Sequence, residues 1–451
     1  MIRPASLLHG RGRLLLFAFG DFAFNLYWQS IMLFLLFYYS DVLELRMGVA
    51  TAIYMVASVW DGIANLIAGI YFDRGQSGRR YGAILIAGSV PLALTFVLTY
   101  APPPVHGLAG ILLIGAFHML FRTAYAAVNV PYLVMSARIS PDPGDRSFVA
   151  GARMLFGTAA VVSVALLTVP VGTALFGAQR PADAFFGAAV AFAAIGAAIL
   201  LLVGATYRDD LVAAQPPAAN MRATFSSLAR NRAFATLMAA MMAMIVATTV
   251  LNKSVLYYFK YVLDDPAAGQ LALATMGVIS AIAVPLWMAL GRLVGLRALW
   301  LITAGAGMAA LALFAIFGIY GTLAMQVFLV AMQVMIVGLN FVFWALLPNT
   351  IEYGERATGL HVEGGVFGVA ALLQRIAIGV ATAILGWGFV SAGYVANARQ
   401  SAETLAGMRA TVALVPLAFL ALSCLAMLRH PLGHARDRRD APEPPPQEAV
   451  I

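Results

Sequence analysis

Five charged residues lie inside long apolar stretches of this sequence, where an ionised side chain is costly unless it has a partner. They are Asp21, Asp61, Arg122, Lys253 and Arg375. Two acids and three bases can form buried ion pairs, hold a cation at a carboxylate, or bind a solute that carries hydroxyl or anionic groups. For each residue the alternative is a purely structural ion pair or a side chain that snorkels to the membrane surface.

Polar residues accompany three of these charges at helical spacing. The three stripes are Asp21, Asn25, Trp28 and Gln29; Tyr54, Ser58, Asp61 and Asn65; and His118, Arg122, Tyr125 and Asn129. Residues spaced in this way share one face of a helix. Because a stripe that faced lipid would leave all of its polar groups unsatisfied, we expect the stripes to face one another across a wet cavity.

The rest of the chain has the composition of a membrane protein. Of 451 residues, 62% are hydrophobic and 11% are charged, against about 25% charged in soluble domains. Apolar stretches long enough to cross a hydrocarbon core of about 30 Å as helices recur along the chain. They lie near residues 14–38, 47–71, 83–101, 107–136, 148–177, 184–206, 234–260, 269–291, 297–318, 321–347, 364–393 and 408–429. The sequence therefore predicts an all-α membrane protein with twelve transmembrane helices.

The polar segment 207–233 divides these spans into two six-helix halves, 1–206 and 234–429, and a charged, proline-rich tail covers 430–451. At 1.5 Å per residue, Asp21, Asp61 and Arg375 lie about 12 to 17 Å into their spans, near the midplane. Secondary transporters bind substrate and coupling ion at that depth, between two repeats. Lys253 lies about 28 Å along its span, so we expect it to snorkel to the outer interface.

The basic residues outside the spans concentrate on one set of loops, which predicts that both termini are cytoplasmic and that the protein is multi-pass in a plasma membrane, such as a bacterial inner membrane. The net charge of +8 is spread over many short loops, so we expect contact with lipid headgroups and none with nucleic acid. Cys424 is the single cysteine. No HExxH or GxSxG motif is present, so we expect neither an enzyme nor a cofactor.

Segments carrying these residues are similar to those of a known family. They are GDFAFNLYWQ, FYYSDVL, WDGIANLIAGIYFDR, NVPY, DRSFVAGAR, NKSVLYYFKYVL, EYGERATGLHVEGGVFG and LLQR, between residues 20 and 375. In this order, they resemble the glycoside-pentoside-hexuronide:cation symporter family of the major facilitator superfamily. The resemblance implies the major facilitator fold and symport of a small solute. We expect the protein to be a monomer.

The resemblance also implies roles for individual residues. Asp61 matches the family's acid for cation coupling, and the substrate-binding positions match Asp21, Tyr125, Asn129, Arg153 and Arg375. The family's second coupling acid is replaced by Asn65, whose amide oxygen can ligate Na⁺ without adding charge. Protonation of Asp61 therefore competes with Na⁺ as the coupling event, and beyond a Na⁺ at Asp61 we expect no metal.

The substrate stays open between several classes. Where the resemblance places a second sugar-binding acid, this sequence has Asn129. Arg122 adds a hydrogen-bond donor suited to carboxylate, sulfate or phosphate. A hexuronide, another anionic glycoside or a lysolipid therefore competes with a neutral sugar, and the alternative for Arg122 is a structural pair with Asp21 or Asp61. Trp28, Tyr125, Tyr132 and Trp344 are candidates to stack on a sugar ring or to serve as packing. A sensor that no longer transports is the remaining functional class.

A second motif concerns gating. GIYFDRGQSGRR resembles a cytoplasmic loop of the superfamily that latches helix ends together, which implicates Asp73, Arg74 and Arg80. The equivalent loop of the second half contains Glu352, Glu355 and Glu363. We expect these glutamates to pair across the cytoplasmic face with Arg138, Arg146 or Arg292.

Overall fold

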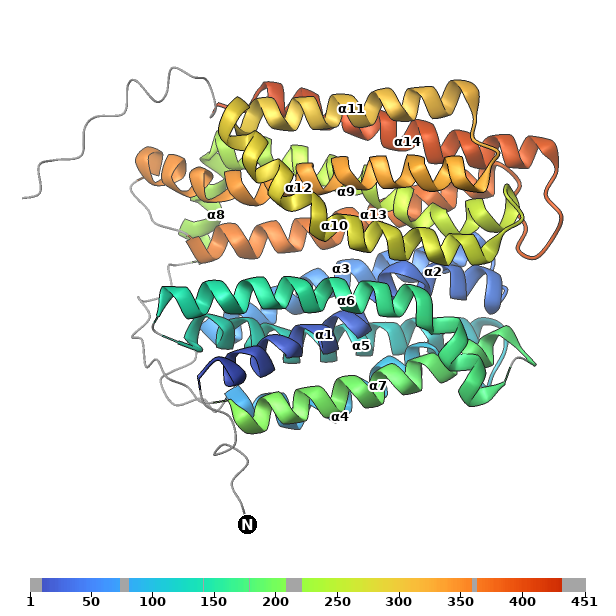
Figure 1. The fold of residues 1–451 in the computed structure, drawn as a ribbon, viewed down its shortest axis with the longest axis horizontal. Coiled ribbons are helices and arrows are strands. Elements are labelled where there is room, and N and C mark those ends of the chain that lie inside the picture. Colours follow the sequence, from blue (N-terminus) through green and yellow to red (C-terminus); the bar gives the residue numbers. More distant parts are fainter. Residues whose placement is uncertain are drawn as a thin grey trace, which may run out of the picture.

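The computed structural model describes residues 10–73, 81–140, 142–177, 179–207, 221–358 and 363–431, and regular structure within these ranges is helical throughout. The first half contains α1 (Arg11–Leu33), α2 (Leu35–Phe37), the π-helix η2 (Tyr38–Val42), α3 (Met47–Asp73), α4 (Tyr81–Thr99), α5 (Gly107–Arg138), α6 (Pro143–Phe176) and α7 (Pro181–Thr206). The second half contains α9 (Arg232–Tyr261), α10 (Pro266–Val294), α11 (Leu296–Phe317), α12 (Thr322–Thr358), α13 (Glu363–Ser391) and α14 (Ala402–Leu428) (Figure 1).

The predicted spans are present in the part of the chain that the structure describes. Eleven helices are each long and apolar enough to cross a membrane, and α1 with the short α2–η2 segment forms a twelfth span bent by 47°. The all-α, twelve-span prediction is confirmed. In the segment 207–233, helix α8 (Met221–Arg230) precedes α9, and residues 208–220 lie outside the described ranges.

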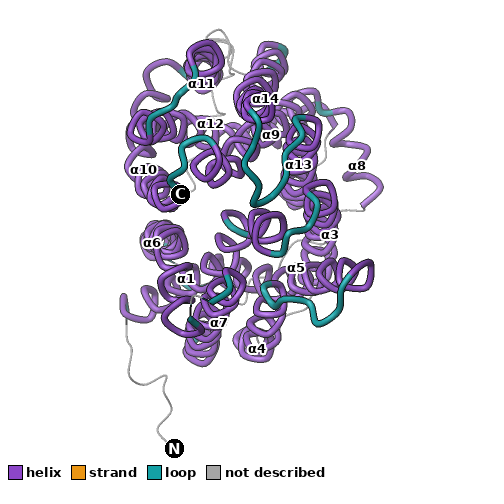
Figure 2. Tube along the Cα trace, turned by 90° about the vertical axis from the view of Figure 1, so that its right-hand side faces the viewer, coloured by secondary structure: helices purple, strands orange, loops and turns teal. Residues whose placement is uncertain are grey.

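Helix α1 begins and α14 ends at the same end of the molecule, which we call the termini face (Figure 1). The bent end of α1 and the loop between α13 and α14 lie at the other end, the opposite face, which is turned toward the viewer in Figure 2. Across the interface between the halves, α3 packs on α13 and α6 packs on α10. The interface therefore has two helix pairs, one on each side of the molecular centre.

Small residues let helices approach closely where side chains would hold them apart. A Cβ at Gly62 would lie 2.7 Å from Leu372 Cδ1 and 3.2 Å from Arg375 Cβ, and one at Gly379 would lie 3.2 Å from Ser58 Cβ. Gly62 on α3 faces α13, and Gly379 on α13 faces α3, both near the midplane. Their lack of side chains brings the backbone of Arg375 close to the turn that carries Asp61.

The hairpin of α6 and α7 uses the same device. A Cβ at Gly172 would collide with the backbone of Ala184, and one at Gly187 would lie 2.8 Å from the Gly172 carbonyl oxygen.

We predict that Gly172→Ala lowers the midpoint of thermal unfolding of the purified protein, because overpacking costs roughly 1 to 3 kcal/mol. Gly305→Ala on α11 is the matched control, since nothing lies within 4 Å of its added Cβ. Equal midpoints for the two variants would contradict the packing argument.

Candidate functional site

A cavity of about 1000 Å³ lies between the two halves. The first half contributes polar residues from α1 and α6, and the second half contributes them from α9, α10 and α12. The polar lining comprises Asp21, Asn25, Gln29, Arg153, Thr158, Asn252, Ser280, Gln333 and Asn340. A cavity of this size at the interface of two repeats, lined by apolar side chains and a few polar groups, is the arrangement from which transporters build a substrate site.

Asp21 and Arg153 form an ion pair in the wall of this cavity. Arg153 donates to Asp21 Oδ1 from Nε at 3.1 Å and from Nη2 at 3.0 Å. Gly157 leaves room beside the pair, because a Cβ there would lie 3.3 Å from Asn25 Nδ2. The guanidinium also lies 5.2 Å from the centre of the Tyr132 ring. The structure thus brings together two residues predicted to bind substrate, and the carboxylate and the guanidinium both border the cavity.

Asp61 forms a separate, more deeply buried cluster. Its side chain is 0% exposed, and Oδ2 pairs with Arg122 Nη1 at 3.4 Å and with Arg375 Nε at 3.1 Å. Oδ1 accepts a hydrogen bond from Asn65 Nδ2 at 3.0 Å. Arg122 belongs to α5 in the same half as Asp61, whereas Arg375 belongs to α13 in the other half. A single carboxylate therefore bridges the two halves through two cations.

Aromatic and imidazole groups complete this cluster. Arg375 lies 3.9 Å and Arg122 4.9 Å from the centre of the Trp28 ring. Arg122 Nε also donates to His118 Nε2 at 3.1 Å. With 1% of its side chain exposed, Arg122 is held by Asp61 rather than presented to the cavity. In this conformation Trp28 packs against the two guanidinium groups.

The predicted substrate residues thus divide between two places. Asp21 and Arg153 border the cavity, while Arg122 and Arg375 surround Asp61. Tyr125 is buried beside Trp28, with ring centres 5.6 Å apart, and Asn129 is half-buried on the same helix. Trp344 borders the cavity from α12 and is half exposed. Their roles in binding remain predictions.

The expectation that Lys253 snorkels to the surface is wrong. Its side chain is 5% exposed; Nζ donates to the Met32 carbonyl at 3.2 Å and lies 3.8 Å from the centre of the Tyr54 ring. Helix α1 ends at Leu33, so the Met32 carbonyl belongs to its last turn, at the negative end of the helix dipole. Lys253 is buried because it caps this interrupted helix, which hydropathy could not reveal.

The predicted gate residues fall mostly beyond what the structure describes. Arg74, Arg80 and the side chains of Asp73 and Glu363 lie outside the described residues. Glu352 and Glu355 are exposed, and Glu352 lies 4.0 Å from Arg356 one turn along its own helix. Pairing of these residues across the termini face remains a prediction.

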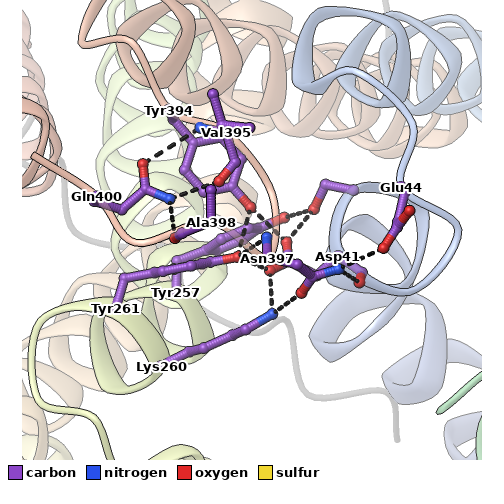
Figure 3. Close-up of polar contacts among 11 residues, drawn as sticks. Asp41, Glu44, Tyr257, Lys260, Tyr261, Tyr394, Val395, Asn397, Ala398 and Gln400 are labelled. Carbon is purple, nitrogen blue, oxygen red and sulfur yellow. Dashed lines mark hydrogen bonds and ion pairs between the residues drawn. The ribbon is translucent and has the colours of Figure 1, made fainter.

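A cluster centred on Asp41 joins the halves at the opposite face (Figure 3). The buried carboxylate accepts hydrogen bonds from Lys260 Nζ at 2.7 Å, Tyr261 OH at 2.5 Å and Tyr394 OH at 2.7 Å. Asn397 donates to the Asp41 carbonyl at 2.8 Å and accepts from Lys260 at 2.6 Å. Burial raises the pKa of the Tyr394 hydroxyl, and the nearby negative charge of Asp41 raises it further. The hydroxyl therefore stays protonated and donates its hydrogen bond. We call these five residues the Asp41 latch.

Sequence reasoning missed the Asp41 latch as a functional group. Its acid and its lysine occur in FYYSDVL and NKSVLYYFKYVL, two of the segments that carry the family resemblance. Each charge by itself is typical of a span end, where charged residues are common. The sequence did offer one signal for this cluster. Asp41 ends the first span of the first half, and Lys260, of opposite charge, ends the first span of the second half.

Comparisons with known proteins agree with this architecture. A family model described as MFS/sugar transport protein matches residues 16–434. The glucuronide carrier protein homolog of Escherichia coli (strain K12) is 25% identical over 427 residues, covering 92% of this chain and 91% of that protein. The isoprimeverose transporter of Lactiplantibacillus pentosus is 23% identical, covering 94% of this chain and 90% of that protein.

Solved structures show the same fold. A crystal structure of the nucleoside transporter NupG has a TM-score of 0.64 at 16% identity, covering 93% of this chain and 97% of that one. A bacterial homologue of the human lysosomal transporter Spinster, inward-facing and unoccupied, has a TM-score of 0.66 at 13% identity, covering 93% and 96%.

The family match over residues 16–434, together with the membrane-spanning helices, makes this chain a multi-pass membrane transporter of the major facilitator superfamily. The chain belongs to the glycoside-pentoside-hexuronide:cation symporter family, and it is a transporter rather than an enzyme.

The Asp41 latch yields a test of how the halves are held together. We predict that Asp41→Asn lowers the free energy of unfolding by roughly 3 kcal/mol, because it leaves Lys260 without its buried counter-charge. Asp183→Asn, which breaks an exposed pair with Arg180 on the same face, should cost less than about 1 kcal/mol. Thermal unfolding of the purified variants measures the difference.

A double-mutant cycle with Lys260→Met isolates the pair itself. The double variant should lose less than the sum of the two single losses, since each single change leaves one partner unpaired. Strictly additive losses would show that the pair does not hold the opposite face together.

Proposed function

We propose that this protein is a cation-coupled symporter of sugars or glycosides that works by alternating access in a bacterial inner membrane, with Asp61 as the coupling site and the termini face in the cytoplasm. The observation that carries the proposal is the sharing of Asp61 between Arg122 of its own half and Arg375 of the other. The concentration of arginine on the loops of the termini face supports the orientation.

The charge balance at Asp61 links ion binding to movement. Arg122 and Arg375 share one carboxylate, so two positive charges and one negative charge leave a formal +1 when all three groups are ionised. Adding a proton or Na⁺ at Asp61 removes the charge that holds Arg375. Since breaking one side of a buried pair costs roughly 3 to 5 kcal/mol, cation binding favours a conformation in which Arg375 has moved away with its own half.

Both Na⁺ and H⁺ are compatible with this scheme. A proton needs only the Asp61 carboxylate, whereas Na⁺ also needs neutral oxygens such as the Asn65 amide oxygen. Within the described residues, no group of three or more His, Cys, Asp or Glu side chains could hold a metal ion. A Na⁺ at this site would therefore rely on one carboxylate and neutral ligands.

The cavity lining supports a hydroxyl-rich substrate. Its charged members named above, Asp21 and Arg153, pair with each other, and the remaining polar groups are amides and hydroxyls. Sugar hydroxyls can donate to the carboxylate and accept from the guanidinium. The similarity to a glucuronide carrier homologue and an isoprimeverose transporter supports the same substrate class.

An anionic glycoside such as a hexuronide is the second candidate, favoured by the two guanidinium groups against Trp28. Arg122 is enclosed with Asp61 in this conformation. An anion would reach it after Arg375 has left Asp61, and entry of one anion with one cation would leave the net charge of the cluster unchanged. A carboxylate-bearing sugar therefore fits the coupling scheme as well as a neutral one does.

We predict that Asp61→Asn uncouples transport. In proteoliposomes without a membrane potential, an inward Na⁺ or H⁺ gradient of about 50-fold supplies about 2.3 kcal/mol per coupled ion, enough for about 50-fold accumulation. Wild type should approach this value for one member of a panel of galactosides, glucuronides, pentosides and a lysophospholipid, with a Na⁺ or a pH gradient. The variant should exchange that solute yet stop at equal concentrations inside and outside.

Asp183→Asn serves as the control, because its carboxylate lies in an exposed pair far from the midplane. It should accumulate solute as wild type does. The proposal would be overturned if wild-type uptake did not depend on either the Na⁺ or the pH gradient, or if Asp61→Asn still accumulated the solute. Uptake of the lysophospholipid alone would move the function to a lipid or other amphiphile.

A further inference from the structure

The wall of the cavity formed by the second half carries uncharged hydrogen-bonding groups that no role described above uses. Asn252 comes from α9, Ser280 from α10, and Gln333 and Asn340 from α12. Gln333 and Asn340 are seven residues apart, two turns along one face of α12. This wall lies in the half opposite to Asp21 and Arg153.

Two acceptor atoms of this wall lack partners. Asn252 Oδ1 and Gln333 Oε1 are buried, and neither has a hydrogen-bond partner among the described residues. A buried acceptor without a donor is costly, so such an atom beside a cavity points to a ligand that supplies the donor.

The amide of Gln333 is held in a fixed orientation. Its Nε2 donates to Ser280 Oγ at 2.7 Å, and Ser280 Oγ donates in turn to the Met276 carbonyl at 2.9 Å. The serine proton is therefore committed to the helix, and the serine oxygen receives the glutamine. With its nitrogen fixed in this way, Gln333 keeps its Oε1 as a free acceptor.

A backbone acceptor lies next to these side chains. Pro285 lies within α10 and has no N–H, so the carbonyl of Ala281 loses its usual helical donor. Both Ala281 and Pro285 border the cavity. In a membrane-spanning helix a freed carbonyl needs another donor, which a cavity ligand can provide.

We propose that Asn252, Gln333 and the Ala281 carbonyl form a second subsite, which accepts hydrogen bonds from a second hydroxyl-bearing ring of the substrate. The inference rests on the proposed function, in which Asp21 and Arg153 bind the first ring. A cavity of about 1000 Å³ is at the upper end of the range for small-molecule sites, roughly 300 to 1000 Å³. The subsite therefore selects two-ring glycosides over single-ring ones.

The test compares sugars that share one ring. Binding to the purified full-length protein is measured by isothermal titration calorimetry with three pairs: methyl β-galactoside and lactose, methyl β-glucoside and cellobiose, and methyl β-xyloside and xylobiose. Wild type should bind the disaccharide of at least one pair about tenfold or more tighter than its methyl glycoside, since each added neutral hydrogen bond is worth roughly threefold to tenfold.

The variant Gln333→Met keeps the length of the side chain and removes its amide. It should weaken disaccharide binding about threefold to tenfold and leave methyl glycoside binding unchanged, so the single-ring sugar reports that the protein is folded. Gln326→Met, on the same helix and outside the cavity lining, is the matched control and should bind both sugars as wild type does. Asn252→Leu should act as Gln333→Met does.

The outcomes separate the two proposals. If wild type binds both members of a pair equally, or if Gln333→Met weakens both equally, the second subsite is wrong while sugar transport stands. If wild type binds none of the six sugars, the proposed substrate class fails and the subsite fails with it.

Discussion

The structure depends on one carboxylate that two arginines from different halves compete to neutralise. Asp61 is fully buried, so it requires counter-charge, and it receives this from Arg122 in its own half and Arg375 in the other. The contact is close because Gly62 and Gly379 let α3 and α13 meet with little between them. The ion pair between Asp61 and Arg375 thus lies at the contact between α3 and α13. A change in the charge of Asp61 therefore changes how strongly the two halves are held together.

Two further polar groups sit at different depths around this centre. The Asp41 latch ties the halves at the opposite face, and Lys253 caps the interrupted first helix beside the Asp61 cluster. The cavity lies alongside, bordered by the Asp21–Arg153 pair. The Asp61 cluster, the cavity and the Asp41 latch occupy separate places on the same interface. In the proposed cycle, a ligand in the cavity and a cation at Asp61 therefore act on one movement without touching each other.

Composition and spacing predicted the twelve spans, because an apolar run long enough to cross a membrane has few other stable structures. The residue types also located Asp61 as a buried charge that needs partners. Side-chain partners across the halves could not be predicted in the same way. They depend on helix rotation and on the bend in the first span, which buries Lys253 and carries Asp41 toward α9.

The most direct test of the account is thermodynamic linkage between sugar and cation. The affinity of the purified protein for a transported sugar is measured across Na⁺ concentrations at fixed pH, and across pH without Na⁺. The account predicts that one cation tightens sugar binding and that the sugar tightens binding of that cation by the same factor, because both bias one equilibrium. Sugar affinity independent of both cations would contradict the central role of Asp61.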